Sequence, residues 1–148
     1  MDYDAALMIE PTYKHAELTE KLIGIFFEVY NELGYGFLES VYETAFMQVL
    51  VENGVAFQQQ CPVIVTFRGC EIGEFRADLI AESAVIVELK AVQKLDASHE
   101  KQLLNYLRAT NLEVGLLFNF GPNAQIRRLA LDNQNKKRRK TAAAAQAS

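Results

Sequence analysis

The most constraining feature of this sequence is an apolar run with two charges inside it, Val85-Ile86-Val87-Glu88-Leu89-Lys90-Ala91-Val92. Its length and its β-branched residues predict a buried strand over 84–91. Because side chains two apart on a strand point to the same side, Glu88 and Lys90 should project together. Burying both charges is costly unless they pair or bind something. The run therefore predicts either a partly buried ion pair, an edge strand or a functional site.

Apolar patterns before and after this strand predict the other elements. Apolar residues recur three and four apart in some segments, whereas β-branched and aromatic residues gather in others. The predicted helices cover 15–33, 38–53 and 98–110, and the predicted strands cover 63–67, 73–80, 84–91, 114–120 and 125–131. Short turns favour an antiparallel meander of the first three strands. The order predicts an α/β (α+β) fold with a central mixed sheet flanked by helices.

The same pattern predicts which helix faces turn inward. The residues expected at these faces are Leu18, Leu22, Ile25, Phe26 and Val29 in the first helix, Val41, Ala45, Val49 and Leu50 in the second, and Leu103, Leu104 and Leu107 in the third. Asp96 or Ser98 is expected to cap the third helix, because short polar side chains accept hydrogen bonds from exposed N–H groups there.

The length of 148 residues fits one domain, which we place at 15–131. Residues 1–14 are expected to be a loose lead-in, and the basic, alanine-rich residues 132–148 a disordered tail. The formal net charge of −4 argues against a protein that coats nucleic acid with a uniformly basic surface. It does not argue against an enzyme whose carboxylates hold a metal ion that attracts phosphate.

The sequence shows no sign of a membrane or of secretion. No apolar run reaches the ~18 residues that a membrane span needs, and the first residues are acidic where a signal sequence would be basic. Cys61 and Cys70 flank a predicted strand, which separates them too far for a disulfide. Both are expected to be free thiols in a reducing compartment, and the expected location is the cytoplasm.

A third charged residue supports a functional role for Glu88 and Lys90. Asp78 lies in the preceding predicted strand, and a tight turn near 82–83 would place Asp78 roughly opposite Glu88. Two carboxylates in this arrangement can bind one Mg²⁺, with water and phosphate completing its shell. Lys90 would stand beside the metal, where an ammonium group can orient a water or stabilise developing charge.

Polar residues on two predicted helices are further candidates for this site. Gln102 and Tyr106 are four apart and share one face of a helix, although that face could simply be solvated. Glu39 lies in the first turn of the second predicted helix. There it is either a partner of the helix dipole or another acid aimed at the metal, and Tyr42 follows one turn later on the same face.

These residues resemble the motifs of one nuclease superfamily. Asp78 followed by Glu88-Leu89-Lys90 is similar to the D…ExK core of the PD-(D/E)xK nucleases. Gln102-Leu103-Leu104-Asn105-Tyr106 resembles the Q-x-x-x-Y element of their RecB-like branch, which also carries an upstream helical Glu, here Glu39. Gly36, Glu39 and Tyr42 match the residues that name the small bacterial GxxExxY proteins. The likeness runs from about 18 to 128, with one departure: Tyr30 stands where many relatives carry His.

The resemblance implies a restriction-endonuclease-like core that hydrolyses phosphodiester bonds with Mg²⁺ or Mn²⁺. Carried over by position, Asp78 and Glu88 would be metal ligands and Lys90 the catalytic lysine. Glu39 would be an accessory ligand, and the helical glutamine and tyrosine would position the site or the substrate. The resemblance also implies DNA more often than RNA as substrate, and a homodimer is a further possibility.

Basic residues for phosphate contact are few and scattered. The candidates are Arg76, Lys94 and Lys101, followed by Arg108, Arg127, Arg128 and the basic segment 136–140, and each can equally be ordinary surface charge. Two other interpretations stay open. One is a binding or regulatory module with a nuclease-like fold and weak or no catalysis. The other is a structural oligomer packed through Phe26, Phe27 and Tyr30.

Overall fold

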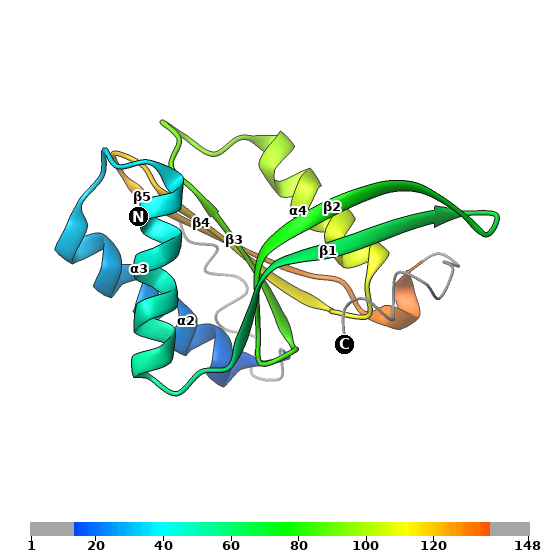
Figure 1. Ribbon diagram of the computed structural model, residues 1–148, viewed down its shortest axis with the longest axis horizontal. Coiled ribbons are helices and arrows are strands. Elements are labelled where there is room, and N and C mark those ends of the chain that lie inside the picture. Colours follow the sequence, from blue (N-terminus) through cyan, green and yellow to red (C-terminus); the bar gives the residue numbers. More distant parts are fainter. Residues whose placement is uncertain (1–13, 137–148) are drawn as a thin grey trace.

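A five-stranded mixed sheet carries helices on both faces (Figure 1). The computed structural model describes residues 14–136. Its elements are α2 (Ala16–Leu33), α3 (Glu39–Glu52), β1 (Phe57–Phe67), β2 (Cys70–Ala81), β3 (Val85–Lys90), α4 (Ala97–Ala109), β4 (Val114–Phe120), β5 (Ala124–Ala130) and the 3-10 turn η1 (Asn133–Asn135). The predicted fold class is confirmed. β1 begins well before its predicted start, because pairing with β2 extends the strand through the glutamine-rich residues 58–60.

Neighbouring strands follow the chain order, β1-β2-β3-β4-β5. β1, β2 and β3 pair antiparallel, which confirms the predicted meander, and β4 and β5 form a second antiparallel pair. β3 and β4 are parallel, so α4 makes the crossover between them on one face of the sheet. Because β3 and β4 lie inside the sheet and are covered on both faces, their side chains are almost all buried.

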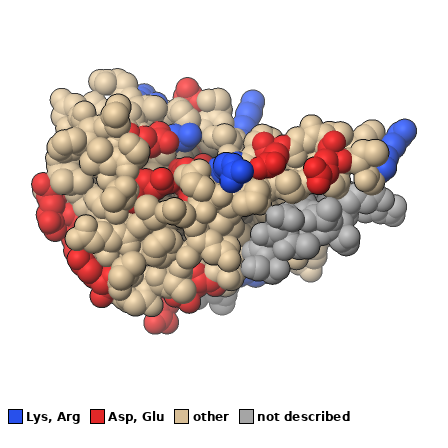
Figure 2. Space-filling model, in the orientation of Figure 1, with Lys and Arg blue, Asp and Glu red and all other residues tan. Residues whose placement is uncertain are grey.

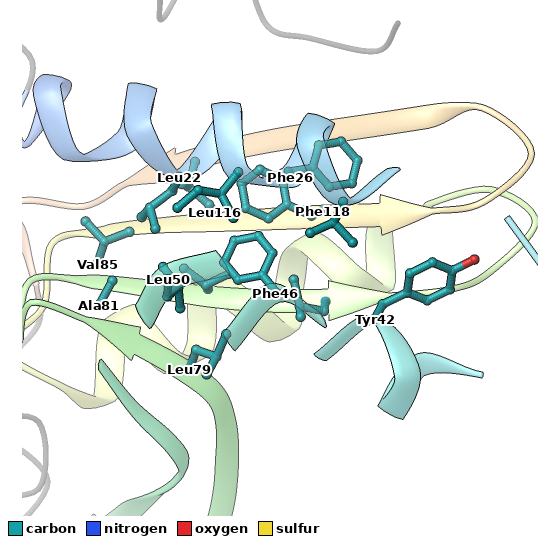
Figure 3. Close-up of a cluster of buried hydrophobic side chains, with 14 of the residues drawn as sticks. Leu22, Phe26, Tyr42, Phe46, Leu50, Leu79, Ala81, Val85, Leu116 and Phe118 are labelled. Atoms are coloured by element: carbon teal, nitrogen blue, oxygen red, sulfur yellow. The ribbon is translucent and has the colours of Figure 1, made fainter. Parts of the chain in front are cut away.

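The two faces of the sheet carry separate apolar cores. On one face, Phe26 of α2 stacks on Phe118 of β4 with ring centroids 4.7 Å apart, and Phe46 of α3 lies 5.7 Å from the same ring (Figure 3). On the other face, α4 packs so closely that a Cβ atom at Gly115 of β4 would lie 2.7 Å from Leu103 Cδ1. Apolar packing therefore accounts for both faces, and polar groups inside the sheet need a separate explanation.

The inner faces of the helices only partly match the prediction. In α2, Leu22, Ile25, Phe26 and Val29 are buried as predicted. In α3 the buried residues are Tyr42, Phe46 and Leu50, whereas Val41 is 40% exposed. In α4 they are Leu103, Tyr106 and Leu107. The aromatic side chains take the inner positions of α3 because they bury more apolar area than a valine can.

We also considered Phe26, Phe27 and Tyr30 as a contact between subunits. This interpretation is wrong for Phe26. Phe26 has no exposed surface within a single copy of the chain. Phe27 packs partly against the same core. Tyr30 donates from its hydroxyl to the carbonyl oxygens of Gly121 and Pro122, at 2.8 and 3.0 Å. The three side chains serve the fold of one chain.

The β1–β2 hairpin changes from one core to the other at Asp78. Leu79 packs into the core under α2 and α3, yet Ala77 packs into the core under α4, although residues two apart on a strand normally face the same side. Gln60, across from Asp78, has a φ of 49° in the left-handed region, and this pair is missing from the β1–β2 ladder. The outer half of the hairpin twists away alongside α4 (Figure 1), and Asp78 sits at the twist.

The C-terminal residues within the described range are ordered against the core. Lys136 Nζ donates to the carbonyl oxygens of Thr110 and Leu112, both at 2.8 Å, and η1 precedes it. The first residues of the predicted tail, 132–136, thus lie against the core. The rest of that tail, with most of the basic segment, and residues 1–13 of the predicted lead-in lie outside the described residues.

Cys61 and Cys70 are free, which confirms the prediction of two unpaired thiols. Cys61 is buried in the core under α4, and Cys70 is exposed in the hairpin. Within residues 14–136, the helices lack the length and apolar character needed to cross a membrane.

Candidate active site

The polar centre of the molecule lies where β2 and β3 separate. Their backbone pairing ends at Leu79 and Val87, and the next two residues exchange side-chain bonds instead. The Asp78 N–H donates to Glu88 Oε2 at 2.7 Å, and the Leu89 N–H donates to Asp78 Oδ2 at 2.8 Å. The two carboxylates thus lie across the opening between the strands, in the relation that the turn near 82–83 predicted. Each uses one oxygen to satisfy a backbone donor of the other strand.

Glu88 is the most buried charged group of this centre, with 4% of its surface exposed. Burial, reinforced by the charge of Asp78, raises the pKa of Glu88 to about 8, although the Asp78 N–H and Lys90 act in the opposite direction. Burial also raises the pKa of Asp78, against the Leu89 N–H, Lys90 and Gln60. Glu88 therefore favours its protonated form near neutral pH unless a cation stabilises its charged form.

A pocket of about 270 Å³ opens beside Asp78. Its lining residues are Glu39, Ser40, Glu43, Gln60, Asp78 and Leu89. Partial burial raises the pKa of Glu39, and the charge of Asp78 raises it further, while Lys90 and the Ala91 N–H lower it. The predicted alternative that aims Glu39 at the site thus has the geometry to support it, because α3 brings this acid to the same pocket as Asp78.

Two residues of this pocket were missed in the sequence. Glu43 lies one helical turn after Glu39, so the i, i+4 spacing could have revealed it. Its pKa is raised by partial burial and by the charges of Asp78 and Glu39, while a hydrogen bond from Gln60 lowers it. Gln60 Nε2 donates to Glu43 Oε2 at 2.9 Å. Nothing in the sequence pattern indicated Gln60, because only the twist of the hairpin turns its side chain toward the carboxylates.

The helix α4 brings Gln102 and Tyr106 to the opposite side of Glu88. Tyr106 is buried, and its hydroxyl donates to the Arg76 carbonyl oxygen at 3.4 Å. Burial raises the pKa of Tyr106 well above its usual value, and the charges of Glu88 and Asp78 raise it further, while a hydrogen bond with Gln102 lowers it. Tyr106 therefore lies on the inner side of α4 near the carboxylates, and the partly buried Gln102 lies next to it.

The start of α4 has a different role. Asp96 caps the helix by accepting from the Ser98 N–H at 2.9 Å, and its own N–H donates to His99 Nδ1 at 3.0 Å. This reciprocal capping box fixes the first turn. The prediction of a cap at Asp96 or Ser98 is thus confirmed for Asp96, and His99 is held by the cap.

Buried amides fix the connection that follows Lys90. Lys90 is half-buried at the end of β3, next to Asn119 of β4. Asn119 accepts from the Val92 N–H at 2.9 Å and donates to the Val92 carbonyl oxygen at 3.0 Å, while Gln125 accepts from the Leu95 N–H at 2.9 Å. These bonds hold the backbone between Lys90 and α4 in one position.

The residues that match the GxxExxY motif divide between two roles. Glu39 lines the pocket, but Tyr42 is fully buried, so the expectation that it shares the outward face of Glu39 is wrong. The Tyr42 hydroxyl donates to the Gly34 carbonyl oxygen at 2.7 Å and accepts from the Phe37 N–H at 3.2 Å, and its ring stacks on Phe120 at 4.3 Å. Gly36 has a φ of 118°. Gly36 and Tyr42 thus shape the loop that leads into Glu39.

The candidate phosphate contacts are mostly engaged within the protein. Arg76 pairs with Glu74 at 3.4 Å, Arg127 pairs with Glu100 at 3.4 Å, and the buried Arg128 donates to the Lys14 carbonyl oxygen at 2.7 Å. Lys94 and Lys101 are exposed. Figure 2 shows acidic side chains along the helical end of this face and basic ones only as isolated spots. The prediction of a phosphate contact is wrong for Arg128, which serves the fold.

The carboxylates fit a metal site that is open to water and substrate. Among residues 14–136, no group of three or more acidic, histidine or cysteine side chains is close enough to form a complete metal cage. Mg²⁺ does not need such a cage, because it keeps several waters and is usually bound through one or two carboxylates together with substrate phosphate. Asp78 and Glu88, one from each strand at the opening, would supply that minimum.

A comparison with known protein families agrees with this geometry. A family model described as the PD-(D/E)XK nuclease superfamily matches residues 16–129, well over half of the chain. No curated protein and no solved structure matches the chain. The matched range contains every residue of the candidate site.

Proposed function

This chain belongs to the PD-(D/E)XK nuclease superfamily, and we propose that it is a Mg²⁺- or Mn²⁺-dependent enzyme that hydrolyses phosphodiester bonds. The observation that carries the proposal is the pair of carboxylates, Asp78 and Glu88, held in the gap between β2 and β3 with Lys90 on the same strand as Glu88. A chain selected only for its fold would not place two carboxylates and an ammonium inside the sheet, because their burial is costly.

Each residue of the centre has a proposed role. Asp78 and Glu88 would hold the metal, and Glu39 would be an accessory ligand or acid at the pocket wall. A bound divalent ion supplies Lewis-acid polarisation of the phosphate and lowers the pKa of a water. Lys90 would orient the attacking water and stabilise the negative charge that develops on the phosphate oxygens.

Two polar residues of α4 would support these groups. Tyr106 lies near Glu88, and Gln102 lies next to Tyr106, so the two would fix the position of the Glu88 carboxylate or of the substrate. Their spacing supports an assignment to the RecB-like branch, and Gly36, Glu39 and Tyr42 support membership in the GxxExxY proteins. By analogy with the superfamily, we propose DNA as substrate before RNA, a homodimer that cuts two strands as a further possibility, and the cytoplasm as the location.

The first test is cleavage of labelled DNA and RNA, each single- and double-stranded, with Mg²⁺, with Mn²⁺ and with EDTA. Glu88→Ala removes a proposed ligand, and Glu74→Ala removes an exposed carboxylate of β2 as the matched control. We expect cleavage that needs the metal, is lost in Glu88→Ala and persists in Glu74→Ala. The substrate that is cut also decides between DNA and RNA.

The alternative is a binding or regulatory module with this fold and little or no turnover. Metal titration by calorimetry separates the two functions. Absence of cleavage on every substrate, together with absence of metal binding, would favour the module and contradict the proposed enzyme.

A further inference from the structure

The loop between α2 and α3 exposes an unusual concentration of large apolar side chains. Tyr35 is 62% exposed and Phe37 is 49% exposed, and Leu33, Leu38 and Val41 flank them on the same segment. We call residues 34–38 the aromatic loop. A cluster of this kind on a protein surface marks a site of interaction, because isolated apolar residues are ordinary whereas gathered ones are not.

The aromatic loop is held in place by several bonds. The Tyr42 hydroxyl bridges its two ends, donating to Gly34 and accepting from Phe37, and the Phe37 ring meets the Tyr42 ring edge-on with centroids 6.0 Å apart. The Gly34 N–H donates to the Tyr30 carbonyl oxygen at 2.8 Å. The backbone of the loop and the Phe37 ring are thus arranged before any ligand arrives, which reduces the entropy lost on binding.

The aromatic loop ends at the candidate active site. Its next residue is Glu39, which lines the pocket with Asp78. Figure 1 shows the α2–α3 connection and the β3–α4 connection at the same end of the molecule. A nucleic acid whose scissile phosphate lay at Asp78 would have its neighbouring nucleotides within reach of this loop.

Charge alone offers little to hold such a substrate. The chain has a net charge of −4, and Arg76, Arg127 and Arg128 are engaged within the protein, so the exposed candidates include only isolated side chains such as Lys94 and Lys101. Exposed aromatic rings provide a different source of affinity, because every base can stack on them and each stack contributes appreciably. Bases offer a free face only where they are unpaired, since the faces in a duplex are already covered.

We propose, resting on the nuclease function above, that the aromatic loop binds unpaired nucleotides beside the scissile phosphate by stacking bases on Tyr35 and Phe37. The substrate class is therefore single-stranded nucleic acid, or the unpaired end or loop of a duplex. The tip of the β1–β2 hairpin also exposes apolar side chains, Phe67 and Ile72. It lies at the opposite end of the molecule from the aromatic loop and has no part in this site (Figure 1).

The test measures binding in EDTA, where hydrolysis cannot interfere. The probes are a fluorescein-labelled dT 20-mer, a U 20-mer and a 20-base-pair duplex. We expect tighter binding of the single strands than of the duplex. Tyr35→Ala or Phe37→Ala should weaken single-strand binding by roughly 5- to 150-fold, the range that corresponds to the loss of one base–aromatic stack. Val51→Ala removes an apolar side chain that is 67% exposed at the far end of α3 and should change nothing.

A second measurement reports stacking directly. The sequence contains no Trp, so Tyr35→Trp gives the protein a single indole. We expect its fluorescence to be quenched by the dT 20-mer and to be unaffected by the duplex, while Val51→Trp, equally exposed but away from the loop, is not quenched by either. Quenching confined to position 35 supports the proposal, and the U 20-mer shows whether RNA is bound as well.

Any of three results would overturn the proposal that bases stack on the aromatic loop. They are equal or tighter binding of the duplex, unchanged binding in folded Tyr35→Ala and Phe37→Ala, or a dimer that Tyr35→Ala dissociates without affecting oligonucleotide binding. The outcome is separate from that of the proposed enzyme. Metal-dependent cleavage of duplex and single strand at equal rates, unaffected by Tyr35→Ala, would leave the nuclease intact and remove the stacking site.

Discussion

The two ends of the β2–β3 pair are built from the same two strands but satisfy their backbone groups differently. At the closed end, residues 79–81 of β2 pair backbone to backbone with residues 85–87 of β3, and their side chains are buried in the two cores. At the open end, Asp78 and Glu88 accept the N–H groups that the opposite strand no longer binds. The closed end thus contributes apolar packing, while the open end keeps charged groups inside the protein at a cost in stability.

This contrast teaches how a small domain can hold an acidic site within its sheet. The strands separate because the β1–β2 hairpin twists away at Gln60 and Asp78, and the carboxylates of Asp78 and Glu88 bridge the gap. Apolar packing at the neighbouring closed end offsets the stability that is lost by holding charged groups at the open end. Changes at the closed end should therefore alter folding, and changes at the open end should alter chemistry.

The largest expected effect is on stability, at the closed end. Ile86→Ala removes a fully buried side chain under α4 and should lower the free energy of unfolding by about 2–5 kcal/mol, because it leaves a cavity. Urea denaturation measures the change. Ile72→Ala, the same substitution at a position that is 63% exposed, should stay within about 0.5 kcal/mol. A loss of cleavage per folded molecule in Ile86→Ala would show that the two ends are not separable.

At the open end, Lys90→Ala should lower kcat by roughly 10²–10³-fold, since it removes a charge proposed to stabilise the transition state. Cleavage under saturating substrate measures this change, and urea denaturation should show little accompanying loss of stability. Lys21→Ala, at an exposed position on α2, is the control. If Lys90→Ala destabilised the fold strongly while the rate per folded molecule persisted, Lys90 would be a structural partner of the carboxylates.

A smaller effect should come from the connection after the open end. A Cβ at Gly121 would lie 2.3 Å from the Val92 carbonyl oxygen, so Gly121→Ala must displace the backbone that follows Lys90. We expect a loss of about 1–3 kcal/mol in the free energy of unfolding together with reduced cleavage. Gly24→Ala, in α2 where nothing lies within 4 Å, should stabilise the helix slightly. An unchanged cleavage rate in Gly121→Ala would mean that this connection does not position the site.

The smallest effect, counted per pH unit, is the change in stability that follows from the protonation of Glu88. The folded pKa of Glu88 is raised from 4.5 to about 8, so the folded protein binds more protons than the unfolded chain between these values. Without metal, this group's contribution to stability is complete below about pH 4.5 and is lost as pH rises through 8, at roughly 1 kcal/mol per pH unit. Glu88→Gln should flatten that slope.

Thermal unfolding in EDTA from pH 5 to 8 measures this slope. An equally steep slope in Glu88→Gln would contradict its assignment to Glu88. Asp78, Glu39 and Glu43 act in the same direction, whereas the surface residues Asp96 and Glu113, whose pKa is lowered, act in the opposite one. Added Mg²⁺ should stabilise the wild-type protein more at pH 8 than at pH 6, because the metal needs the deprotonated carboxylates.

The sequence by itself determined the order of the elements and the chemistry carried by each one. Glu88 and Lys90 had to share one side of β3, and Gln102 and Tyr106 one face of α4, because spacing within a single element is fixed by the geometry of the backbone. The carboxylate pair was also predictable, since the short turn between β2 and β3 sets their register. Local geometry thus specified these three pairs, but it did not specify the face that Tyr42 takes relative to Glu39 on α3.

Only the tertiary structure decided which elements meet at the site. Gln60 reaches Glu43 because the hairpin twists at an unpaired position, and Tyr42 leaves the pocket face because the core under α3 has room for its ring. The sequence likewise did not show that Arg128 is buried against Lys14, far away in the chain. Contacts between distant segments depend on how whole faces pack, and periodicity along one element carries no information about its partner.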